Sequence, residues 1–139
     1  MINLLSTSIT AQPRPAVRRL GLIARWGLQV VLAAQFAVGG ALKLAGDAQM
    51  VDMFTDIGAG QWLRYLVGAL ELAGAAGLLI PRLATLAALG LIVLMTGATV
   101  TNLLILHTSP ALPITFLVAA GVIAASRTIP TRRTRTASQ

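Results

Sequence analysis

The sequence predicts an all-α integral membrane protein: a four-helix bundle with both termini in the cytoplasm and a short amphipathic outer-surface helix between spans one and two. Its 139 residues are 56% hydrophobic and only 11% charged, whereas charged residues make up about 25% of an ordinary soluble domain. Four apolar stretches approach or reach the length of about 20 residues that crosses a hydrocarbon core. The basic residues gather on one side of these stretches. These observations exclude a water-soluble globule and a disordered chain.

The four predicted spans follow one another with short breaks. They cover about residues 21–44, 62–80, 83–106 and 111–126, and the last is the shortest. Proline stands in the second and third breaks, where it ends a helical pattern. We therefore expect one membrane domain, residues 20–127, between two basic cytoplasmic tails, residues 1–19 and 128–139. The first tail lacks the compact apolar core and the cleavage site of a signal peptide.

The excess positive charge predicts the orientation. Nine of the eleven basic residues lie on the side of the two tails: Arg14, Arg18, Arg19, Arg25, Arg82, Arg127, Arg132, Arg133 and Arg135. The opposite side carries Lys43, Arg64, Asp47, Asp52 and Asp56. The positive-inside rule then places both termini in the cytoplasm. A net charge of +7 would also suit nucleic acid, but its placement favours contact with lipid headgroups, so we expect no nucleic-acid partner.

A short helix is predicted over about residues 48–57, in the longest loop. Its apolar residues fall at positions i, i+3, i+4 and i+7, on one helix face: Met50, Met53, Phe54 and Ile57. Asp47 is a candidate side-chain cap for its N-terminus, and the segment 58–60, Gly-Ala-Gly, can end it. The helix is either a plain packing element at the outer surface or a lid over a binding cavity, and the first interpretation is favoured.

Glu71 is the most informative residue of the chain. It lies nine residues into the second span, about 13–14 Å from the outer surface at 1.5 Å per residue. An acid at that depth is costly and normally faces the bundle interior or a water-filled cavity. We expect it to be either protonated or paired with a cation or hydrogen-bond donors. A functional role and a structural pairing are equally good interpretations.

Other polar residues of the outer half complete a candidate ligand or proton site. Its members are Glu71, Gln35, Lys43, Arg64, Asn102 and Thr99. Gln35 lies at a depth similar to that of Glu71, and Arg64 shares nearly the same face of the second span. They predict either a polar cavity open to the outside or a polar packing core, because such residues often join helices or anchor them at the interface. No metal site is expected.

The order of several motifs resembles the DoxX-like family of small four-helix membrane proteins. The motifs are Phe36-x-x-Gly39-Gly40-x-x-Lys43-Leu44, Met53-Phe54, Trp62-x-x-Tyr65-x-x-Gly68-x-x-Glu71-x-x-Gly74 and Leu78-Leu79-Ile80-Pro81, and they cover about residues 26–105. The loop departs at 58–60, where many relatives have a proline. The resemblance implies a bacterial inner-membrane protein, with quinone as a possible cofactor and other membrane or redox proteins as possible partners. It brings no accepted set of catalytic residues.

Two functions stay open at this point. The first is a membrane subunit that binds a hydrophobic ligand, quinone or lipid, or anchors a redox partner. The alternative is a proton-coupled transporter or channel subunit that uses Glu71, in which homo-oligomerisation would supply the path that four spans lack. A stand-alone oxidoreductase is least favoured, because the chain has no cysteine and a single histidine and carries no dinucleotide-binding fingerprint.

Overall fold

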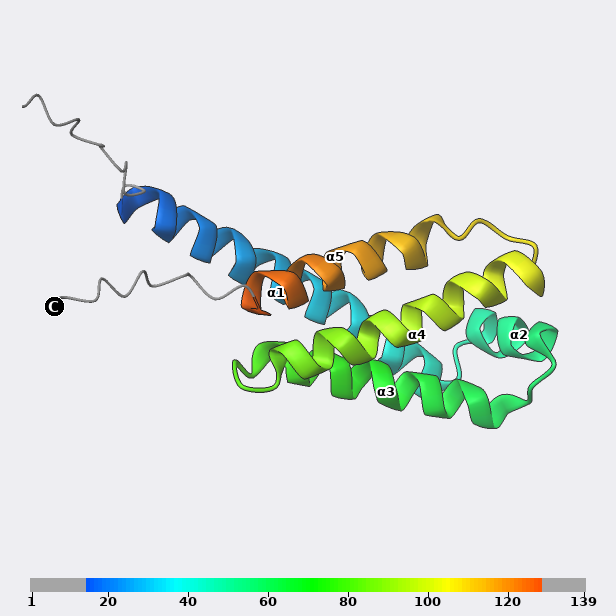
Figure 1. Cartoon of the computed structure of the whole chain (residues 1–139). Coiled ribbons are helices and arrows are strands. Elements are labelled where there is room, and N and C mark those ends of the chain that lie inside the picture. Colours follow the sequence, from blue (N-terminus) through cyan, green and yellow to red (C-terminus); the bar gives the residue numbers. More distant parts are fainter. Residues whose placement is uncertain (1–14, 129–139) are drawn as a thin grey trace, which may run out of the picture.

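The structure is a computed structural model that describes residues 15–128, and this part of the chain is all helical, with no strand. The helices are α1 (Pro15–Ala45), α2 (Ala48–Ile57), α3 (Gln61–Leu79), α4 (Ala84–Leu104) and α5 (Ala111–Thr128) (Figure 1). All except α2 are long and apolar enough to cross a membrane. Successive long helices run in opposite directions, so the predicted membrane four-helix bundle is confirmed.

Helix α1 begins earlier than its predicted span and projects beyond the bundle (Figure 1). It includes Pro15, the first described residue, and so takes in part of the predicted tail of residues 1–19. Its 31 residues are about 46 Å long, far longer than α3 or α5. The remaining residues of the two predicted tails, 1–14 and 129–139, lie outside the described part.

The bundle is built from two close helix pairs, α1 with α3 and α4 with α5. The core residues come from all four long helices: Leu32, Ala33, Phe36, Ala75, Leu78, Ala88, Leu91, Met95, Ala120, Ile123 and Ala124. Across the pairs, the rings of Phe36 and Phe116 lie 5.4 Å apart between centroids. Large apolar side chains also cover the outside, where Val93 is 73% exposed, as a lipid-facing surface requires.

Two glycines bring the backbones of α1 and α3 together. A Cβ atom added to Gly40 would lie 2.7 Å from the carbonyl oxygen of Gly68, and one added to Gly68 would lie 3.0 Å from that of Gly40. Association of helices in lipid depends on such close packing and on polar contacts, because apolar helices gain little by leaving lipid tails. The reciprocal contact therefore fixes how α1 lies on α3.

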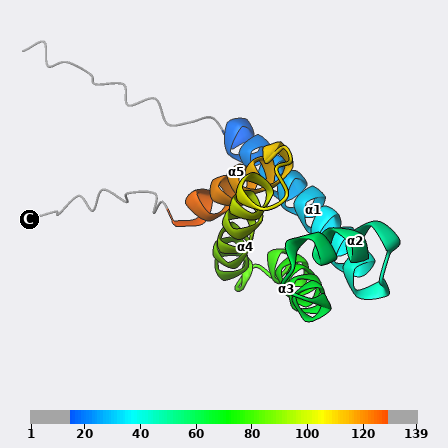
Figure 2. The same ribbon diagram turned by 90° about the vertical axis from the view of Figure 1, so that its right-hand side faces the viewer.

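The short helix α2 lies across one end of the bundle, against α1 and α3 (Figure 2). Its bounds agree with the predicted range, Phe54 is buried, and Gly58 ends it with a left-handed φ of 78°. The predicted side-chain cap is wrong, since the Asp47 carboxylate makes no capping hydrogen bond within the described residues. The backbone of Asp47 instead joins the two helices, with its N–H bonded to the Leu42 carbonyl and its own carbonyl to the Val51 N–H.

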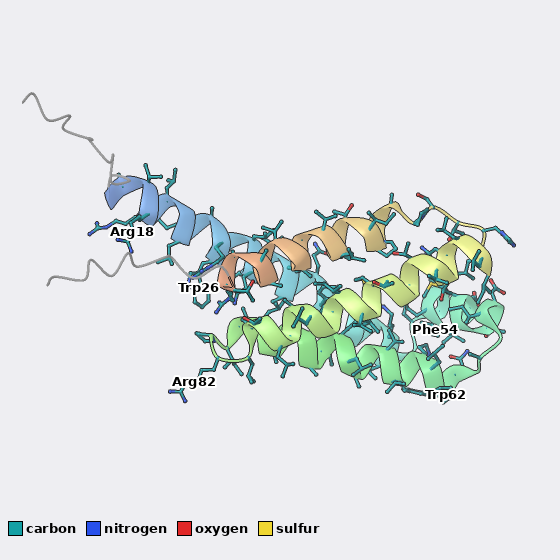
Figure 3. All side chains as sticks on the ribbon, in the orientation of Figure 1. Arg18, Trp26, Phe54, Trp62 and Arg82 are labelled. Carbon is teal, nitrogen blue, oxygen red and sulfur yellow. The ribbon has the colours of Figure 1, made fainter. Side chains whose placement is uncertain are left out.

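The two ends of the bundle differ in charge. Figure 3 shows Arg18 and Arg82 at the end that holds the α3–α4 turn, with Phe54 and Trp62 at the opposite end, beside α2. We call these the arginine end and the α2 end. The three aspartates, Asp47, Asp52 and Asp56, belong to α2 and its N-cap, so they are separated from Arg18 and Arg82 by the length of the bundle.

Replacing Gly40 by alanine tests the close approach of α1 and α3. Its added methyl group meets backbone rather than a flexible side chain, so we expect Gly40→Ala to lower the free energy of unfolding by about 1–3 kcal/mol. Gly97→Ala is the matched control, because nothing lies within 4 Å of its added Cβ, and alanine favours a helix by up to about 1 kcal/mol. Thermal unfolding in mild detergent measures both, and equal midpoints would contradict the close contact.

Candidate functional site

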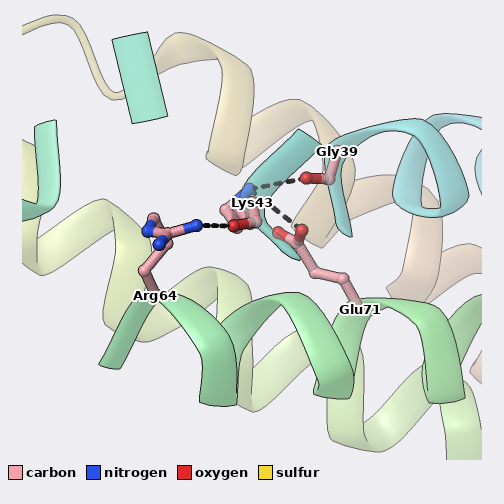
Figure 4. A network of polar contacts seen from close by, with 4 residues as sticks. All are labelled: Gly39, Lys43, Arg64 and Glu71. Atoms are coloured by element: carbon pink, nitrogen blue, oxygen red, sulfur yellow. Dashed lines mark hydrogen bonds and ion pairs between the residues drawn. The ribbon is translucent and has the colours of Figure 1, made fainter. Parts of the chain in front are cut away.

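The candidate site centres on an ion pair between α1 and α3. The Lys43 ammonium lies 2.9 Å from a carboxylate oxygen of Glu71, and their side chains are 12% and 6% exposed. The same ammonium also lies 3.5 Å from the carbonyl oxygen of Gly39 (Figure 4). The structure therefore pairs the deep acid of the second span with a cation of the first.

Small residues make room for this pair. Gly39 stands opposite the carboxylate, where an added Cβ would lie 3.4 Å from Glu71 Oε2. One residue on, Gly40 permits the backbone contact that brings α1 onto α3. In the motif Gly39-Gly40-x-x-Lys43, the two glycines pack against α3 and the lysine binds Glu71. All three lie on one face of α1, since residues three and four apart share a helix face.

Arg64 is buried on α3 like Glu71, but it does not bind Glu71 within the described residues. It is only 4% exposed, and its Nη1 donates to the carbonyl oxygen of Lys43 (Figure 4). Its Nε donates to Gln61 Oε1 at 2.7 Å, while Gln61 Nε2 donates to the Val51 carbonyl of α2 at 3.1 Å. Arg64 therefore ties the end of α1 to α3, and through Gln61 to α2.

The three other candidate residues lie apart from the ion pair. Gln35 is an exposed residue of α1. Thr99 donates to the Met95 carbonyl of its own helix at 2.8 Å, the usual habit of a threonine in a helix. Asn102 donates to the Ser109 carbonyl at 3.2 Å and holds the α4–α5 loop. Their place in the outer half of the spans grouped these residues in the prediction, and none of them hydrogen-bonds to Lys43 or Glu71 within the described part of the chain.

Comparison with known proteins adds a family assignment. The model of the DoxX-like family matches residues 27–125. The chain belongs to the DoxX-like family. Neither a curated protein nor a solved structure matches it. The match spans most of α1 and α5 and all of the helices between them, so the Lys43–Glu71 pair lies inside the family region.

A second polar cluster of this DoxX-like chain was not among the predicted site residues. At the arginine end, Gln29 is fully buried. Its Nε2 donates to the Leu78 carbonyl, and its Oε1 accepts from Arg127 Nη2 at 3.0 Å. A signal existed in the sequence, because Gln29 extends the core stripe that Leu32, Ala33 and Phe36 form at helical spacing.

The third feature is an apolar groove between α3 and α4. Its volume is about 330 Å³. Every lining residue is glycine, alanine, valine or leucine: Leu70, Ala73, Gly74, Gly77, Leu83, Leu86, Ala87, Gly90, Leu91, Val93 and Leu94. These side chains suit a hydrocarbon chain, and within the described residues they offer no hydrogen-bond donor to a quinone carbonyl.

A double-mutant cycle on Lys43 and Glu71 tests the ion pair. Lys43→Met and Glu71→Met each leave a partly desolvated charge without its partner, so each should lower the free energy of unfolding by about 3 kcal/mol. The double variant should lose clearly less than the sum, because two unbranched apolar side chains replace the pair. Detergent unfolding of the four proteins gives the coupling energy. Additive losses would show that the two charges do not interact.

Proposed function

We propose that this DoxX-like chain is a membrane subunit of the bacterial inner membrane that binds the hydrocarbon chain of a lipid or of a quinone. Both termini lie in the cytoplasm, with the arginine end inside, as the positive-inside rule requires. The observation that carries the proposal is the groove between α3 and α4. Ligand sites in membrane bundles and in soluble proteins alike are concave and mostly apolar.

The shape of the groove supports this ligand class. Along α4 it runs from Leu83 to Leu94, eleven residue steps or about 16 Å at 1.5 Å per residue. Small residues of both helices belong to its lining, including Gly77 of α3 and Ala87 of α4, where an added Cβ on the glycine would lie 2.8 Å from the alanine Cβ. Leucine and valine make up the rest of the lining. A quinone would bind through its isoprenoid tail, with its ring elsewhere.

Proton-coupled transport has less support. Transport would require Glu71 to take up and release a proton, and each protonation would leave the Lys43 ammonium without its counter-charge between apolar helices. The cost of such an uncompensated charge is several kcal/mol. The pair therefore favours a structural role for Glu71. Unchanged proton flux of Glu71→Gln in proteoliposomes agrees with this role, and loss of flux would favour the transporter.

Filling the groove tests the proposal. Gly90→Leu places a branched side chain into the groove, where nothing lies within 4 Å of the added Cβ. We expect a several-fold loss of bound lipid or quinone, measured by native mass spectrometry in mild detergent after adding each ligand separately. Gly97→Leu is the matched control on the same helix, outside the groove. Equal retention by both variants would contradict the groove as the site, and the same spectra report redox partners and homo-oligomers.

A further inference from the structure

Two arginines at the arginine end of the bundle have no acidic partner among residues 15–128. Arg25 comes from α1, and Arg127 comes from the last turn of α5. Arg25 lies one turn before Gln29 on α1, and Gln29 binds Arg127, so both arginines lie on the side of α1 that carries Gln29.

The Arg127 side chain is held in a fixed orientation by neutral acceptors. Its Nη1 donates to the Pro81 carbonyl at 2.9 Å and its Nη2 to Gln29 Oε1 at 3.0 Å. Gln29 is itself fixed, because its Nε2 donates to the Leu78 carbonyl. These hydrogen bonds therefore connect α1, α5, the end of α3 and the turn that follows α3.

The remaining donors of the cluster point to an anion. The Nε atoms of Arg25 and Arg127 are both buried, and neither has a hydrogen-bond partner among residues 15–128. A buried donor left unpaired costs about 1–3 kcal/mol. No carboxylate side chain of this chain can supply the partner: the four acids are Glu71, which binds Lys43, and the three aspartates at the α2 end, and the segments 1–14 and 129–139 contain neither Asp nor Glu.

We propose that Arg25 and Arg127 form a binding site for a phosphate group. Guanidinium groups match the geometry of phosphate oxygens and bind them through charge-assisted hydrogen bonds. One phosphate beside the two arginines is attracted by both of their guanidinium charges. The phosphate belongs either to the headgroup of an anionic lipid or to a soluble phosphate compound. The site does not depend on the occupant of the α3–α4 groove.

The test measures stabilisation of the purified full chain in a mild non-ionic detergent. Three probes are added separately: phosphatidylglycerol, diacylglycerol with the same acyl chains, and inorganic phosphate. The difference between the two lipids measures the phosphate contribution, so a failure of the groove proposal leaves this readout intact. A shift in unfolding temperature with phosphatidylglycerol alone assigns the site to a lipid headgroup, and a shift with inorganic phosphate assigns it to a soluble compound.

Two variants and a control locate the effect. Arg25→Gln removes one charge without breaking a hydrogen bond of the described residues, and Arg127→Lys keeps the charge but loses the planar donor geometry. Each should weaken phosphate binding by about tenfold or more, the equivalent of one charged hydrogen bond. Arg82→Gln removes an exposed arginine at the same end and should leave binding unchanged. Absence of any shift in the unaltered protein, or an equal loss in Arg82→Gln, would overturn the proposal.

Discussion

The rest of the structure depends on the contact between α1 and α3. Gly40 and Gly68 approach each other through their backbones, and one turn away the Lys43–Glu71 ion pair joins the same two helices. Close packing sets the distance between the helices. The ion pair forms only when α1 and α3 have the rotation and the axial register that bring Lys43 to Glu71. In lipid, where apolar surfaces alone do not distinguish one helix face from another, such a pair specifies how the two helices dock.

Side chains of neighbouring helices bind backbone carbonyl groups near the C-termini of α1 and α3. The last carbonyl groups of a helix lack partners within it, and in a membrane an unpaired carbonyl is costly. Here long polar side chains from neighbouring helices supply the donors. Arg64 binds the Lys43 carbonyl near the end of α1, while Gln29 binds the Leu78 carbonyl near the end of α3. The guanidinium of Arg64 also suits the negative end of the helix dipole. At both ends of the bundle, buried polar side chains therefore donate hydrogen bonds to backbone carbonyl groups.

The sequence predicted the helices well because apolar length and proline breaks are local signals. The short helix over residues 48–57 was predicted equally well, since its apolar residues repeat at helical spacing. The partner of Glu71 could not be predicted, because Gln35, Lys43 and Arg64 were all candidates in the outer half of the spans. The choice depends on the rotation of α1 against α3, which arises from tertiary packing at Gly40 and Gly68. The contact of Arg127 with Gln29 joins residues 98 positions apart, and no local pattern specifies it.

The use of one face of α3 for α1 decides where a ligand can bind. Arg64, Gly68 and Glu71 of α3 are buried and contact α1. Leu70, Ala73 and Gly77 point elsewhere and leave an apolar groove along α4. The intramembrane acid, which the sequence singles out, is paired with Lys43 in the interface of α1 and α3. The two proposed binding sites, the groove and the pair of arginines, therefore do not include the acid.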